Sequence, residues 1–149
     1  RFLVSLSVGY PGLEDELKIM EDRKESDPLA ALLPVLSLKE TLDLREECRR
    51  THLDDEIKRY VLEITRATRE HPDVLMGASP RASLGLARIA QARAMLDGRD
   101  FVRPEDVKKT AVPCLAHRLI LKSAGRLNLE RNAAPILEIL DRVPIPRKR

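Results

Sequence analysis

Residues 77–83 form the segment of this chain that could most plausibly do chemistry, because they place an arginine in the first turn of a predicted helix. Ser79 has the side chain of an N-cap residue, whose hydroxyl accepts from a free backbone N–H, and Pro80 suits the first helical position because it has no N–H to leave unpaired. Arg81 then lies one residue inside. A cation there opposes the positive end of the helix dipole, which costs roughly 0.3–1 kcal/mol when the group is exposed.

An anion held between the Arg81 guanidinium and the free N–H groups would turn this conflict into a binding site, and phosphate is the anion such a site suits. The alternative is a solvated arginine that pairs with Asp73 or Glu70. Arg81 would then have a structural role only. Local physics leaves both interpretations open.

The sequence contains no phosphate-binding loop of its own. That loop requires G-x-x-x-x-G-K-[ST], and none of the six glycines here precedes a lysine. Asp54-Asp55-Glu56 superficially resembles an acidic group that holds Mg²⁺, but such carboxylates follow a buried strand, and only Leu53 precedes these. Asp54 is therefore interpreted as a helix cap.

The cysteines and histidines predict neither a metal site nor a disulfide. Their spacing matches no zinc motif, and the two cysteines stand far apart, which favours a reducing, cytoplasmic location. No apolar run is long enough to span a membrane, and no signal peptide is recognised. The residues in question are Cys48, Cys114, His52, His71 and His117.

The composition is that of one domain with a sizeable core. Of the 149 residues 43% are hydrophobic and 34% charged, and the net charge is +3. Aromatic residues make up 3%, which leaves little for base stacking, and Arg88 and Arg93 are five residues apart and do not share a helix face. Nucleic-acid binding is therefore not indicated. Because the first residue is Arg1 and not Met, we expect a fragment of a longer protein.

Apolar periodicity predicts a mainly helical chain preceded by one strand. Residues 2–8 alternate apolar side chains and end at Gly9, and because no partner strand is recognised later, the rest of the sheet is expected outside this chain. We expect residues 27–34 to form a loop, and Gly98 to end the helix that Ser79 opens. The other helices are predicted to begin near Leu13, Ser37, Asp54, Pro104 and Asn132.

The predicted helices differ in how clearly they show an inward face. The one after Asp54 has a regular apolar stripe at Ile57, Tyr60, Val61, Ile64 and Ala67. The one after Ser79 carries small or apolar residues around most of its circumference, which predicts a central, closely packed helix. Three inward positions are expected after Ser37, although that stripe is irregular; they are Leu38, Leu42 and Cys48.

Several ordered motifs along the whole chain resemble the C-terminal lid of MoxR-type AAA+ ATPases. The resemblance implies that residues 1–12 form the end of the ATPase core and residues 13–149 a helical lid. The family commonly has a threonine that could cap a helix where this sequence has Arg103. The motifs are Arg1-Phe-Leu3, Gly9-Tyr-Pro11, Asp54-Asp-Glu56, residues 77–84, Ala90-Gln-Ala-Arg-Ala94, Gly98-Arg-Asp-Phe-Val102, Pro104-Glu-Asp-Val107, His117-Arg-Leu119 and Val143-Pro-Ile-Pro146.

The resemblance also implies a function. The lid would close over ATP and Mg²⁺ bound to the missing core, with Arg81 matching the sensor 2 arginine that reaches the γ-phosphate, beside Ser79 and Pro80. Arg1 matches the arginine finger that serves a neighbouring subunit of a homo-oligomeric ring. Family members act as chaperone-like motors on partner complexes, often through proteins with a von Willebrand A domain.

Two interpretations compete with this one. The first is a helical nucleic-acid-binding module, suggested by the net positive charge and the basic tail at residues 147–149. The second is a plain protein-interaction domain. It fits the composition but does not account for Arg81.

The first prediction follows from the missing phosphate-binding loop. Residues 1–149 alone should bind ATP negligibly and hydrolyse none, because they hold no Mg²⁺-binding carboxylate at a strand end and no water-positioning group. Phosphate release by the purified chain measures this. Turnover that survives repeated purification and responds to substitutions within the chain would contradict it.

Overall fold

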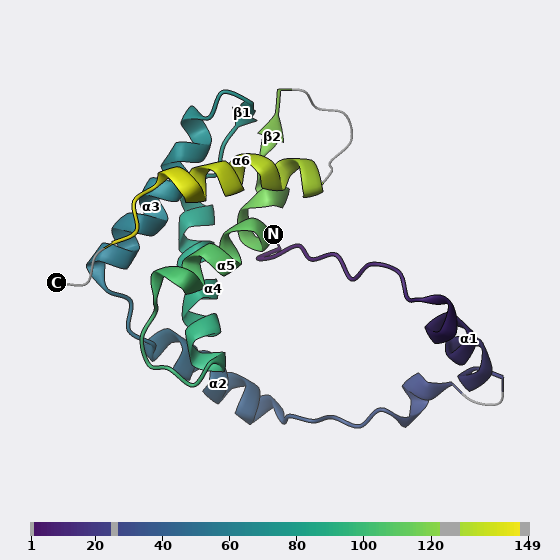
Figure 1. Ribbon diagram of the computed structural model, residues 1–149. Helices are drawn as coiled ribbons and strands as arrows, with labels where there is room; N and C mark the ends of the chain where they lie inside the picture. Colours follow the sequence, from purple (N-terminus) through teal and green to yellow (C-terminus); the bar gives the residue numbers. More distant parts are fainter. Residues whose placement is uncertain (1, 25–26, 123–128, 147–149) are drawn as a thin grey trace. The chain divides into compact units, whose positions relative to one another are not determined.

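The computed structural model describes residues 2–24, 27–122 and 129–146 and shows a mainly helical protein, as predicted (Figure 1). The chain divides into two compact units, Leu6–Leu44 in one and Arg1–Ser5 with Arg45–Arg149 in the other. None of the described helices is long and apolar enough to cross a membrane.

The smaller unit contains α1 (Leu13–Asp22), the 3-10 turn η1 (Pro28–Ala31) and the start of α2 (Leu38–Arg50). The predicted capping box is confirmed, because Glu40 N–H donates to the Ser37 hydroxyl at 3.2 Å and Ser37 N–H donates to the Glu40 carboxylate at 2.7 Å. The predicted loop at 27–34 contains η1. The expected inward face of α2 is wrong at Leu38 and Leu42, which are exposed. Cys48 is partly buried, and no residue of this helix is fully buried.

The larger unit is built from four helices of the described chain, with short elements between them. Figure 1 shows α4 lying between α3 and α5, which agrees with the contacts among these helices. Their side chains form one hydrophobic core. The elements are α3 (Asp55–Glu70), β1 (Val74–Met76), α4 (Pro80–Leu96), α5 (Pro104–Leu115), η2 (Ala116–Arg118), β2 (Ile120–Leu121) and α6 (Leu129–Arg142).

Helix α3 forms as its sequence predicts. The Asp54 carboxylate accepts from Glu56 N–H at 2.8 Å, which confirms the predicted helix cap. The predicted apolar stripe is buried along most of its length, and Tyr60 and Ile64 are among the largest fully buried side chains of the core. The same face also buries two threonines, Thr65 and Thr68, which the apolar pattern did not include.

Helix α4 is the central helix, as predicted. Ala82, Leu86, Ala90 and Ala94, which recur every four residues, are completely buried. Mostly small side chains along this line allow neighbouring helices to approach closely. The helix ends at Leu96, and Gly98 follows the C-cap Asp97 as predicted; its φ of 72° is the left-handed conformation that glycine adopts without strain.

The short antiparallel pair β1–β2 was not predicted. Val74 pairs with Leu121 and Met76 with Ile120, and Lys122 N–H donates to Asp73 O at 2.9 Å. Strands of three and two residues are too short to show a period in the sequence.

Residues 2–5 lie against the end of α5 and form no strand within the described chain. Ser5 N–H donates to Pro113 O at 2.9 Å, and the Arg118 guanidinium donates to Phe2 O at 2.6 Å. His117 Nε2 lies 3.3 Å from the same oxygen. His117 and Arg118 thus hold the N-terminal segment against the end of α5. The strand predicted at 2–8 needs neighbouring strands, and residues 2–24, 27–122 and 129–146 supply none for it, so it stays a prediction.

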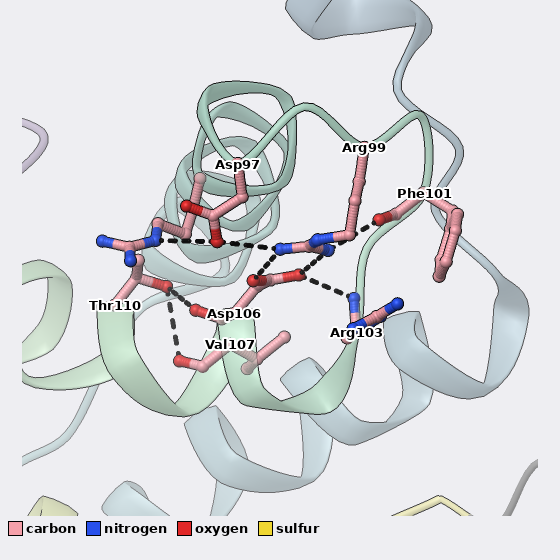
Figure 2. Close-up of polar contacts among 8 residues, drawn as sticks. Asp97, Arg99, Phe101, Arg103, Asp106, Val107 and Thr110 are labelled. Carbon is pink, nitrogen blue, oxygen red and sulfur yellow. Dashed lines mark hydrogen bonds and ion pairs between the residues drawn. The ribbon is translucent and has the colours of Figure 1, made fainter.

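A buried carboxylate joins the end of α4 to the start of α5 (Figure 2). The Arg99 guanidinium donates to both Asp106 oxygens, at 2.7 and 2.8 Å, and to Asp97 at 3.1 Å. Asp106 also accepts from Arg103 N–H at 2.8 Å, so the third residue of α5 caps the helix from inside. A threonine hydroxyl at position 103 would accept from the Asp106 N–H, but this N–H already donates to the Arg103 carbonyl at 3.0 Å.

The charge state of Asp106 follows from these contacts. Burial by itself raises the pKa of the carboxyl, but the hydrogen bonds from Arg99 and from the Arg103 N–H outweigh it, so the net pKa lies below its usual range. The same bonds raise the pKa of Arg99, which stays charged.

We expect Asp106→Asn to destabilise the fold at neutral pH by about 1.5–3 kcal/mol, because Arg99 loses its charged partner. A lowered folded-state pKa contributes stability that is present above the unfolded pKa of about 3.9 and is lost as the pH falls through the folded pKa. The difference between wild type and variant should therefore shrink below about pH 4. Urea unfolding across pH measures it.

The control for this prediction is Asp55→Asn, the same substitution at an exposed first-turn carboxylate that pairs with Lys58. It should change stability much less, because an exposed pair is well solvated. A gap between wild type and the Asp106 variant that stays constant from pH 7 to pH 3 would show that the carboxylate charge is not what holds the turn.

Candidate functional site

Arg81 occupies the second position of α4, as predicted, and its side chain is exposed. Within the described residues it makes neither a side-chain hydrogen bond nor an ion pair. Pairing with Asp73 or Glu70, the structural alternative, is therefore not observed. The cation remains at the positive end of the helix without a counter-charge from this part of the chain.

Ser79 and Pro80 stand at the N-cap and first helical positions, but the cap differs from the prediction. The Ser79 hydroxyl accepts no hydrogen bond from the helix. Ala82 N–H instead donates to the Ser79 carbonyl at 2.8 Å, a tight i→i+3 bond that satisfies this donor without a side chain. No described residue accepts from Arg81 N–H, so a backbone donor and a guanidinium stand together at this helix end.

The loop that leads into α4 is pressed against the last turns of α3. A Cβ atom on Gly77 would lie 2.6 Å from the Arg69 Cα and 2.7 Å from the Thr68 carbonyl oxygen. These are backbone atoms of a helix and cannot move aside cheaply. Only glycine allows this approach, which places the start of α4 directly beside α3.

Polar groups of α3 then hold the loop in place. Ala78 N–H donates to the Thr68 hydroxyl at 2.9 Å, and the Arg69 Nε donates to Ala78 O at 2.7 Å. The Thr65 and Ser83 hydroxyls are 2.9 Å apart. We call these five residues the α3–α4 clamp: Thr65, Thr68, Arg69, Ala78 and Ser83. Sequence analysis missed it, although threonines three residues apart on a buried helix face were a usable signal.

The N-terminal segment reaches the same side of α4. A Cβ on Gly85 would meet Leu3 Cδ1 at 3.1 Å, and the Arg118 guanidinium at 3.9 Å. Gly85 follows Arg81 by four residues, so both lie on one side of the helix. The chain that arrives from the N-terminus therefore lies one turn along α4 from Arg81.

The remaining candidates add no chemistry to this site. Arg1, the predicted arginine finger, lies outside the described residues. Burial raises the pKa of the Cys114 thiol, and Arg118 only partly opposes this, so the thiol is a poor nucleophile. Across residues 2–24, 27–122 and 129–146, no group of three His, Cys, Asp or Glu side chains could hold a metal ion.

A surface groove of about 860 Å³ lies elsewhere in the larger unit. It is bordered by the start of α3 near Asp54, by residues 101–105 and by Ile145 and Pro146. None of the predicted site residues in the described chain lines it. We therefore do not assign it to the Arg81 site.

Comparison with known proteins gives this geometry a family context. Residues 66–139 match the family model of the AAA lid domain. The chain is 37% identical over 149 residues, all of its length, to Uncharacterized protein YeaC of Bacillus subtilis, and covers 47% of that protein. It is also 35% identical over 130 residues to Chaperone MoxR1 of Mycobacterium tuberculosis. That match covers 81% of this chain and 34% of the relative.

A solved structure extends the likeness to three dimensions. The crystal structure of a candidate ATPase from Cytophaga hutchinsonii superposes with a TM-score of 0.80 at 30% identity, over 99% of this chain and 47% of that one. The chain thus spans about half the length, or less, of these relatives.

We expect Gly77→Ala to destabilise the larger unit by about 1–3 kcal/mol, because the new methyl group overlaps the backbone of α3. Urea unfolding followed by circular dichroism measures the change. Gly12→Ala is the matched control, since its Cβ would have Asp15 Oδ2, at 3.7 Å, as its nearest neighbour. Equal effects of the two substitutions would refute the close approach at Gly77.

Proposed function

The chain is the C-terminal lid of a MoxR-type AAA+ ATPase, and we propose that it closes over ATP bound to an AAA+ core, with Arg81 as the sensor 2 residue that contacts the γ-phosphate. The observation that carries this proposal is the isolated charge of Arg81 at the start of α4. Within the described chain this exposed cation has no acidic partner, and it sits where the helix dipole disfavours it.

The donors at this helix end suit a terminal phosphate. A guanidinium presents several N–H groups in a planar fork that matches phosphate oxygens, and the Arg81 backbone N–H adds a donor from the helix itself. A dianionic group brought between them satisfies the helix end and the side chain together. Ser79 and Pro80 contribute by setting where the helix begins, and the Ser79 hydroxyl is free to reach the same phosphate.

The path of the N-terminal segment supports a core on this side of the lid. Leu3 covers Gly85, one turn from Arg81, and Arg118 holds the Phe2 carbonyl. We assign residues 1–12 to the end of the core and residues 13–149 to the lid. A core that continues from this segment approaches the face of α4 that begins with Arg81.

The rest of the proposed function belongs to the whole protein. The core would supply the nucleotide site, where ATP provides the phosphoryl group to be transferred to water and Mg²⁺ would neutralise charge on its phosphates. Arg1 acts as the arginine finger toward the nucleotide of a neighbouring subunit in a homo-oligomeric ring. The cycle of closing and opening drives chaperone-like assembly or activation of partner proteins, von Willebrand A domain proteins among them, in the cytoplasm. One relative of this chain is named a chaperone.

Arg81→Ala in the full-length protein should lower the rate of ATP hydrolysis at least tenfold while leaving the melting temperature unchanged or slightly higher. The rate falls because a phosphate contact is lost. The fold keeps its stability because an exposed cation at a helix N-terminus contributes little or unfavourably to it. Steady-state phosphate release and thermal unfolding measure the two effects.

Arg88→Ala is the matched control, since Arg88 is an exposed arginine two turns along the same helix. It should leave hydrolysis unchanged. The sensor hypothesis fails if Arg81→Ala destabilises the protein but turnover per folded molecule stays at the wild-type value, which is the pattern of a purely structural arginine.

A further inference from the structure

The first turn of α4 is held at two points, one on each side of Arg81. Before the helix, Ala78 is bound through both of its peptide groups: its N–H donates to Thr68 and its C=O accepts from Arg69. Inside the helix, Ser83 meets Thr65 at 2.9 Å. All three partners lie on one face of α3, at positions 65, 68 and 69.

The hydroxyl of Thr68 has one proton, which it donates to Thr65 O at 2.6 Å. Thr68 therefore accepts from the Ala78 N–H. The Thr65 hydroxyl lies 3.1 Å from both Val61 O and Leu62 O and 2.9 Å from the Ser83 hydroxyl, and either member of that last pair could donate. Polar groups on both sides of Arg81 are therefore bonded to hydroxyls fixed on one helix.

These threonines do more than fill space. Both are completely buried, where valine would fill the same volume and would suit an apolar face better. The Thr68 hydroxyl is the acceptor for a buried backbone N–H that would otherwise stay unpaired. Apolar side chains at these two positions would fill the core equally well. The threonine hydroxyls add hydrogen bonds, which are directional and therefore fix the orientation of the groups they join.

We propose that Thr65 and Thr68, acting through Ala78 and Ser83, are positioning residues that set the direction in which Arg81 points toward the phosphate. This inference rests on the proposed function of Arg81. The guanidinium lies at the end of a long side chain, so a small tilt of the first turn of α4 displaces it substantially. Misplacement of a reacting or stabilising group by about 1 Å can cost a hundredfold in rate.

The experiment compares two substitutions of Thr68 in the full-length protein. Thr68→Val keeps the volume and removes the acceptor, and Thr68→Ser keeps the acceptor. Thr68→Val should lower kcat/KM for ATP about tenfold, whereas Thr68→Ser should stay within about twofold of wild type. Thr110→Val is the control, since the Thr110 hydroxyl bonds only to carbonyls of its own helix, Asp106 O and Val107 O.

A double-mutant cycle separates positioning from general damage. If Thr68 acts through Arg81, Thr68→Val should slow hydrolysis in the wild-type background and add nothing in the R81A background. Equal slowing in both backgrounds overturns the inference while the sensor role of Arg81 stands. If R81A alone leaves hydrolysis unchanged, the proposed function fails and the inference fails with it.

Ser83→Ala provides an independent variant should Thr68→Val fold poorly. It removes the Ser83 hydroxyl from the other side of the clamp and leaves the Thr65 hydroxyl bonded to the α3 backbone. We expect a smaller loss of kcat/KM, about threefold, again absent in the R81A background. A loss that persists in that background counts against positioning, as above.

Discussion

The close packing of α4 against α3 and α5 is the constraint on which the other features of the larger unit depend. Ala82, Leu86, Ala90 and Ala94 lie every four residues along α4 and are completely buried. Small side chains bring helix backbones near one another, so little space remains for side chains to adjust. The same closeness recurs at Gly77, where the loop touches the α3 backbone. A helix held this way can present a charged residue at its end in one orientation.

The two ends of α4 are fixed by different chemistry, and the difference suits a phosphate site. The C-terminal end is tied to α5 by the buried Arg99–Asp106 pair, whose opposite charges neutralise each other. The N-terminal end is tied to α3 mainly by neutral hydroxyls. A carboxylate at that end would pair with Arg81 and compete with a phosphate for it. Hydroxyls fix the backbone without occupying the guanidinium, and the one charged member of the clamp, Arg69, adds positive charge.

Sequence reasoning succeeded where a residue acts through its immediate neighbours. Asp54, the apolar stripe of α3, the capping box at Ser37 and the stop at Gly98 are set by spacings of one to four residues, and all were predicted. It failed where the partner is distant in sequence. Thr65 and Thr68 look like interruptions of an apolar face until Ala78 and Ser83 come beside them, and Leu38 and Leu42 show a helical spacing although nothing in their unit buries them. The helix dipole argument located Arg81 and the resemblance to a family implied its role, but neither revealed the contacts that we propose orient it.

The N-terminal segment contacts α4 one turn from Arg81. This placement affects how the lid would respond to a nucleotide. Leu3 lies over Gly85, where a Cβ atom would come within 3.1 Å of Leu3 Cδ1, closer than ordinary van der Waals contact. Arg118 and His117 hold the Phe2 carbonyl from the turn that follows α5. If the N-terminal segment moves, its contact at Gly85 displaces α4 directly, one turn from Arg81. Because α4 is packed against both α3 and α5, such a movement is expected to turn the helices together. Under the proposed function, the position of Arg81 relative to the phosphate would then depend on the residues that join the core to the lid.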